Sequence, residues 1–145
     1  EAFDQVRQRT LRQKRNRQSL ANEVREMREK MRIHLGGRPK DGKFSLKQGS
    51  GGIVDIEFMV QFAVLAWSGE HPELACWSVT IRTLESLADV GLITAQQSQQ
   101  LIEAYKAYRS AGHRLQLQNQ LAEVADSEFL PHRAMVQEQW QQLFS

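Results

Sequence analysis

Apolar residues recur every three or four positions along most of the chain, and this spacing predicts helices. In residues 19–34 the apolar positions fall on one helical face, with Ser19 as a candidate N-cap and Gly36 as a candidate stop; the face consists of Leu20, Val24, Met27, Met31 and Leu35. Residues 53–68 are apolar on nearly every side and are followed by Gly69. That pattern is typical of a helix buried among others.

Three more helices are predicted in the second half of the chain. Ser78 can cap the first, which runs to Gly91 and carries Ile81, Leu84, Leu87 and Ala88 on one face. Thr94 and Gln97 form a capping box that opens the second, whose face holds Ser98, Leu101, Tyr105, Tyr108, Gly112 and Leu115. Pro131 suits the first position of the last helix, which presents Val136, Trp140 and Leu143.

Residues 36–52 differ from the rest, because they contain six of the nine glycines and one of the three prolines and so predict a loop. Within it, residues 43–47 alternate polar and apolar side chains, which indicates a short strand or an extended segment. We therefore expect an all-α bundle of five or six helices with one glycine-rich loop. Residues 19–145 would form the bundle domain, and residues 1–18 a basic N-terminal helix or a partly ordered lead-in.

Charge is unevenly distributed along the chain. Residues 1–47 hold 14 Lys and Arg against 6 Asp and Glu, whereas residues 48–145 hold 5 against 11. The basic part could meet nucleic acid, a nucleotide or an acidic domain, or it could be a solvated helix surface. The longest apolar stretch is interrupted by Asp55, Glu57 and Gln61, so no membrane helix is predicted. The single cysteine, Cys76, and the lack of a secretory signal favour the cytoplasm.

The common catalytic motifs are missing from the sequence. The histidines, at positions 34, 71, 113 and 132, lie far apart, which makes a zinc site improbable. There is no phosphate-binding P-loop, no nucleophile elbow and no paired aspartates that would hold Mg²⁺. We predict no complete catalytic set and no metal site.

The segment from Lys47 to Phe58, KQGSGGIVDIEF, is the candidate functional site. A basic residue precedes a glycine turn that opens directly into the buried helix, an arrangement that could receive a phosphate through Lys47, Gly49, Gly51 and Gly52. Alternatively, the glycines fit a tight turn, and Asp55 and Glu57 cap the helix themselves. Both interpretations remain open.

An acid inside a buried helix needs a partner, and Glu57 sits among apolar neighbours. Arg25, Arg28 and Arg32 follow one another at steps of three and four and form one stripe on the preceding helix. Either this stripe clamps the acids of the buried helix, which we favour for Arg25 and Arg28, or it faces an anionic ligand across a domain boundary.

The string KQGSGGIVDIEF, with EVREMREKMR before it and CWSVTIRTLESLADVGLI after it, resembles the C-terminal helical region of the bifunctional glutamine synthetase adenylyltransferases. The resemblance covers residues from about 19 to the end. It favours the half that attaches AMP, since Val54 and Asp55 stand where the AMP-removing half more often has Arg and Glu. The segment Trp77–Ser78 with Arg82, and the end from Trp140 to Phe144, are also similar to the attaching half.

The resemblance implies an accessory helical domain beside a preceding catalytic nucleotidyltransferase domain, with glutamine synthetase and the PII signal protein as partners. ATP and Mg²⁺ would serve the parent enzyme, and neither would bind this piece alone. The family's catalytic carboxylates precede this region, so no catalytic or metal residue is carried over and the chain alone should be inactive. The alternative is a stand-alone basic helical module that binds nucleic acid, whereas the family implies no nucleic acid and no membrane.

Overall fold

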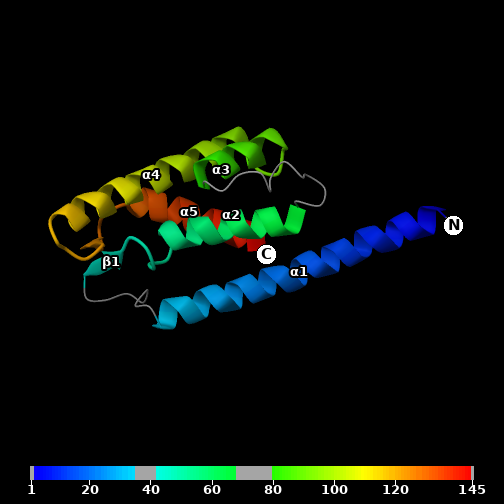
Figure 1. Cartoon of the computed structure of the whole chain (residues 1–145), viewed down its shortest axis with the longest axis horizontal. Helices are drawn as coiled ribbons and strands as arrows, with labels where there is room; N and C mark the ends of the chain where they lie inside the picture. Colours follow the sequence, from blue (N-terminus) through cyan, green and yellow to red (C-terminus); the bar gives the residue numbers. More distant parts are fainter. Residues whose placement is uncertain (1, 35–41, 68–79, 145) are drawn as a thin grey trace.

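The computed structural model describes residues 2–34, 42–67 and 80–144, and in these the chain is an all-α bundle (Figure 1). Its helices and strands follow in this order: α1 (Ala2–His34), β1 (Lys43–Ser45), α2 (Ile53–Trp67), α3 (Thr80–Asp89), α4 (Ala95–Leu117), β2 (Glu123–Ala125) and α5 (Leu130–Phe144). The described part contains five helices and one short strand pair. The all-α prediction is confirmed.

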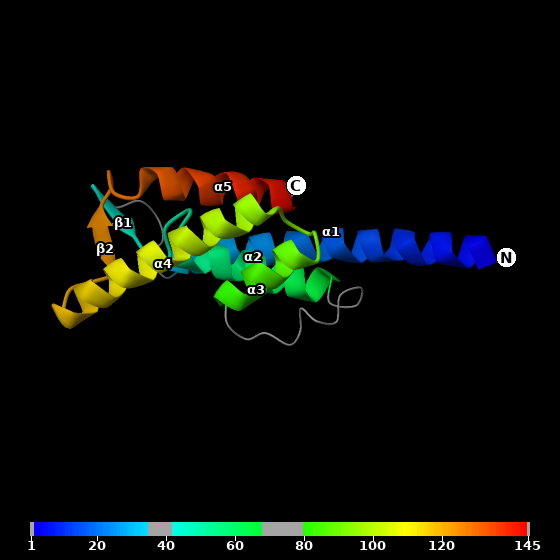
Figure 2. The ribbon, with the colours of Figure 1, turned by 90° about the horizontal axis from the view of Figure 1, so that it is seen from above.

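Helix α2 is the centre of the bundle. It packs against α1, α3, α4 and α5, and Figures 1 and 2 show these helices arranged around it. Its buried side chains include Ile56, Met59 and Phe62, and the core continues into Leu84 and Leu87 of α3 and into Leu101, Tyr105 and Tyr108 of α4. An apolar helix that contacts neighbours on all sides is what its sequence predicts.

Helix α1 is longer than predicted. It runs without interruption from Ala2 to His34, so Ser19 lies inside the helix and the predicted N-cap there is wrong. Residues 2–34 contain neither Gly nor Pro and are rich in Arg, Gln and Glu, so nothing stops the helix upstream of Ser19. The N-terminal half of α1 extends beyond the rest of the bundle (Figures 1 and 2).

The buried stripe of α1 also differs from the predicted one. Met27 was expected on the packed face but is 57% exposed, and the neighbouring Arg28 is 1% exposed in its place. Leu20 and Val24 do pack against the core, as the spacing predicts, and Ala21, which was not predicted there, is buried beside them. The prediction relied on the spacing of apolar residues alone. That criterion assigns buried positions only to apolar side chains, so it placed Met27 rather than Arg28 in the interior.

The capping box of α4 is confirmed. Thr94 Oγ1 accepts the N–H of Gln97 at 3.0 Å, and Gln97 Oε1 accepts the N–H of Thr94 at 2.9 Å. Helix α5 begins at Leu130, one residue before Pro131. The expectations for Gly36, Gly69, Cys76, Trp77 and Ser78 fall outside the described residues.

The extended segment predicted at 43–47 is confirmed for Lys43–Ser45, which form β1, whereas Leu46 and Lys47 already lie in the following turn. The partner of β1 was not predicted. β1 pairs antiparallel with β2, with Phe44 opposite Val124, and the N–H of Leu46 donates to the carbonyl of Ala122 at 2.9 Å. The partner is only three residues long, too short to show an alternating pattern. Among the described helices, none combines the length and apolar character needed to cross a membrane.

Candidate functional site

The glycine turn joins β1 to α2 and is closed by its own backbone. The N–H groups of Gly49 and Gly52 donate to Ser45 O and Gly49 O at 3.0 and 2.9 Å. The first two N–H groups of α2, from Ile53 and Val54, donate to the carbonyls of Leu46 and Lys47 at 2.8 and 3.1 Å. The backbone donors that a phosphate would use at a helix start are therefore already bound within the chain.

Packing explains the three glycines of the turn. A Cβ on Gly49 would lie 2.6 Å from the carbonyl oxygen of Ser45, and one on Gly52 would lie 2.6 Å from that of Leu46. Gly51 has a φ of +83°, and its Cβ would lie 2.6 Å from the carbonyl oxygen of Arg133 on α5. No other residue fits these positions without moving backbone, which supports the structural interpretation of the glycines.

A buried ion pair fastens the turn to α1 and α2. Arg28 Nε donates to Asp55 Oδ1 at 2.5 Å, and the two side chains are 1% and 4% exposed. Asp55 is the third residue of α2, and its Oδ2 accepts the N–H of Gly51 at 2.7 Å. The carboxylate therefore binds the glycine turn that precedes the helix and neutralises the buried guanidinium at once.

Arg28 also holds the turn directly. Its Nη2 donates to the backbone carbonyl of Gln48 at 2.7 Å, and its Nη1 donates to Gln48 Oε1 at 3.1 Å. On the other side, Gln137 Nε2 of α5 donates to Ser50 O and Oγ at 3.1 Å each. Three helices thus fix the turn, and we call Arg28, Gln48, Gly51 and Asp55 the turn lock.

The structure places only part of the arginine stripe on the acid. Arg28 pairs with Asp55, and Arg32 Nη2 approaches the same carboxylate at 3.8 Å while Arg32 Nη1 pairs with Glu29 at 3.0 Å. Arg25 instead donates to Asn22 Oδ1 on the exposed side of α1, so the expectation that Arg25 clamps an acid of the buried helix is wrong.

Glu57 was the wrong acid to single out as buried. It is half-buried rather than enclosed, and it lines a surface cavity between α2 and α3 together with Gln61 and Thr80. Two residues along a helix turn the side chain by roughly 200°, which is why Asp55 faces α1 and Glu57 does not. The need for a charge partner was predicted correctly, but the acid concerned is Asp55, and of the stripe only Arg28 and Arg32 approach it.

Lys47 is the member of the motif that remains available. Its side chain is exposed, while its carbonyl is fixed by the N–H of Val54 at 3.1 Å. The turn lock fixes the backbone of the next residue, Gln48, and of Gly51. The exposed side chain of Lys47 is therefore attached to a rigid backbone. That Lys47 contacts a nucleotide stays a prediction.

An aromatic cluster that the sequence did not reveal packs beside the turn, between β1, α4 and the start of α5. The guanidinium of Arg133 lies 4.0 Å from the ring centre of Phe44, and Tyr108 lies 6.2 Å from Phe44 and 5.4 Å from Phe129. The hydroxyl of Tyr108 is buried without a hydrogen-bond partner among the described residues. Burial raises the pKa of Tyr108 far above its ordinary value, the charge of Arg133 lowers it in part, and Asp55 raises it further.

Comparison with known proteins finds one matching family model and several similar enzymes. The family model described as GlnD PII-uridylyltransferase matches residues 6–125. The chain is similar to the bifunctional glutamine synthetase adenylyltransferase/adenylyl-removing enzyme of Nitrosococcus oceani (47% identity over 98% of this chain and 15% of the relative). Enzymes with the same description from Pseudomonas aeruginosa (46%, 98% of this chain and 16% of the relative) and Mannheimia haemolytica (42%, 100% and 15%) also match. The chain thus spans about 15% of the length of these relatives.

Proposed function

The chain belongs to the GlnD PII-uridylyltransferase family, and on that premise we propose that it is an accessory helical domain of an enzyme that attaches AMP to glutamine synthetase. The observation that carries this proposal is the 42–47% identity, over nearly the whole chain, to glutamine synthetase adenylyltransferases. Within that enzyme we assign the chain to the AMP-attaching half. The partners of the parent enzyme would be the preceding catalytic domain, glutamine synthetase and PII, and its location the cytoplasm.

The turn lock suggests how such a domain would assist. Arg28 and Asp55 fix the glycine turn from inside, and this leaves Lys47 as an exposed cation on a rigid base. Beside a nucleotide site, its ammonium would offer the charge that a phosphate chain needs. One charge-assisted contact of this kind contributes about 1.5–3 kcal/mol. We therefore infer that Lys47 contacts the phosphates of ATP held by the catalytic domain, while Gly49, Gly51 and Gly52 shape the turn that presents it.

The residues present here do not fit a magnesium site. Among the described residues, no group of three His, Cys, Asp or Glu lies together, and the buried acid of the motif, Asp55, is bound to Arg28 and Gly51. The carboxylates for Mg²⁺ would have to come from the catalytic domain, and we derive no step through the metal in this chain. On this account the chain alone carries no transfer activity.

The test should also include UTP, because the matching family model is described as GlnD PII-uridylyltransferase. The intact half enzyme would be incubated with labelled ATP or labelled UTP and with either glutamine synthetase or PII as acceptor. We expect label on glutamine synthetase from ATP, and none when the 145-residue chain is used alone or is deleted from the half enzyme. Transfer by the isolated chain, or uridylylation of PII in place of adenylylation, would overturn the proposal.

A further inference from the structure

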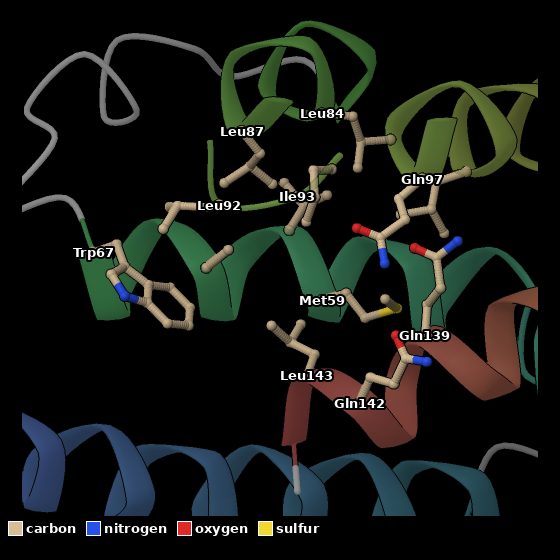
Figure 3. A pocket seen from close by; sticks show the side chains of 13 residues that line it. Met59, Trp67, Leu84, Leu87, Leu92, Ile93, Gln97, Gln139, Gln142 and Leu143 are labelled. Carbon is tan, nitrogen blue, oxygen red and sulfur yellow. The ribbon is translucent and has the colours of Figure 1, made fainter. Parts of the chain in front are cut away.

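A cavity of about 190 Å³ lies between α2, α3, α4 and α5, away from the turn lock (Figure 3). Its walls are apolar and include Met59, Leu84 and Leu143. The cavity is partly open to the surface, and its volume exceeds the roughly 150 Å³ of an apolar cavity that binds benzene. The size therefore suits a small ligand built around one ring or a short branched chain.

One end of the cavity is polar and uncharged. Figure 3 shows Gln97, Gln139 and Gln142 gathered at that end, with Trp67 at the opposite end. Among the described residues, no charged side chain lines the cavity. A zwitterion or a phosphate would lose its hydration there without an opposite charge to compensate it, so the lining selects against charged molecules.

Two of the three glutamines, Gln97 and Gln139, offer one donor and one acceptor to a ligand. Gln97 uses Oε1 to accept the N–H of Thr94 at 2.9 Å, so its Nε2 remains as a donor. Gln139 is only 8% exposed and uses Nε2 toward Gln100 Oε1 at 3.4 Å and Met135 Sδ at 3.0 Å, so its Oε1 remains as an acceptor. Neither remaining group has a hydrogen-bond partner among the residues that the structure describes.

We propose that this cavity is a binding site for a small neutral amide with an apolar body. A carboxamide carries one carbonyl acceptor and an N–H donor side by side, which complements Gln97 Nε2 and Gln139 Oε1, while the apolar body fills the space lined by Met59, Leu84 and Leu87. The site is separate from Lys47 and independent of the proposed transferase role. It would give the helical domain a ligand of its own.

Three probes that share one ring test the proposal on the 145-residue chain: benzamide, toluene and benzoate. Binding would be followed through the side-chain NH₂ signals of Gln97 and Gln139 in ¹⁵N–¹H NMR spectra. We expect benzamide to bind at least about five-fold more tightly than toluene, because only benzamide pairs with both amides. Benzoate should show no saturable binding. Equal affinities of benzamide and toluene, or tighter binding of benzoate, would overturn the proposal.

Two variants with matched controls locate the binding. Gln139→Leu should reduce the preference for benzamide over toluene to about one, whereas Gln116→Leu on the exposed side of α4 should leave it unchanged. Ala63→Phe should fill the cavity and abolish binding of both probes, whereas Ala107→Phe, outside the cavity, should not. Circular dichroism would check folding, and if Ala63→Phe unfolds, the Gln139→Leu preference decides alone. Unchanged preference in Gln139→Leu would contradict the assigned site.

Discussion

Replacing Asp55 with Asn tests whether the turn lock holds the bundle together. The substitution keeps the size of the side chain but leaves the guanidinium of Arg28, 1% exposed, without an opposite charge. Arg32, which lies 3.8 Å from the same carboxylate, is 22% exposed and can be solvated instead. Removing one partner of a buried pair costs about 3–5 kcal/mol. For a chain of this size that corresponds to a fall in melting temperature of roughly 6–20 °C.

The assay would be urea and thermal unfolding followed by circular dichroism at constant pH. Glu29→Gln is the matched control, because Glu29 is 58% exposed and pairs with Arg32 only at the surface. That control should change stability by less than about 0.5 kcal/mol. The double variant Arg28→Met with Asp55→Asn should recover part of the loss, since it removes the uncompensated charge. The single variant Arg28→Met completes the cycle. A loss for Asp55→Asn no larger than for Glu29→Gln, or a loss in the double variant equal to the sum of the two single losses, would refute the reasoning.

The remaining predictions concern packing, titration and partners. Gly52→Val should lower the melting temperature far more than Gly112→Ala, because a Cβ at Gly52 meets the Leu46 carbonyl at 2.6 Å whereas the nearest contact at Gly112 is at 3.9 Å. Gly91→Ala should fall between the two, since nothing lies within 4 Å of its Cβ but its φ of +81° strains alanine; equal shifts for Gly52→Val and Gly91→Ala would contradict the packing argument. Stability should fall as pH rises above about 10, because Tyr108 ionises in the unfolded chain but stays neutral when buried. Tyr108→Phe should flatten that fall in urea titrations without destabilising the chain at pH 7, since the lost hydroxyl has no partner among the described residues. Fluorescence anisotropy with a labelled duplex should show no useful nucleic-acid affinity at any salt, and steep salt-dependent binding would favour the alternative module.

The fold was largely predictable because each helix carries a local signal. The capping box of Thr94 and Gln97, the all-round apolar character of α2 and the alternating segment at β1 each depend on a few neighbouring residues, and all three are found in the structure. The N-terminus of α1 was misplaced because serine occurs both as an N-cap and at exposed positions within a helix. Ser19 is in the second situation: it lies inside α1 with its side chain exposed. β2 was missed since its pairing with β1 joins residues about 80 positions apart.

The candidate site was predicted in its parts but not in its pairing. One of the two interpretations of the sequence was that the arginine stripe meets the acids of α2, yet which acid faces α1 depends on the rotation of α2 about its axis. That rotation is set by the packing of Ile56, Met59 and Phe62, and it points Asp55 rather than Glu57 toward Arg28. The aromatic support from Phe44, Tyr108 and Arg133 could not be predicted because it joins three distant elements.

The most direct test of the account is the effect of Lys47→Ala on AMP transfer to glutamine synthetase by the intact half enzyme. Lys43→Ala is the matched control, because Lys43 is also exposed and lies on the same segment. Losing one charged contact of about 1.5–3 kcal/mol should lower transfer by about ten-fold or more, while the melting temperature barely moves and Lys43→Ala transfers normally. Unchanged transfer by Lys47→Ala, or a loss explained by a lower melting temperature, would contradict the claim that this turn presents Lys47 to the nucleotide.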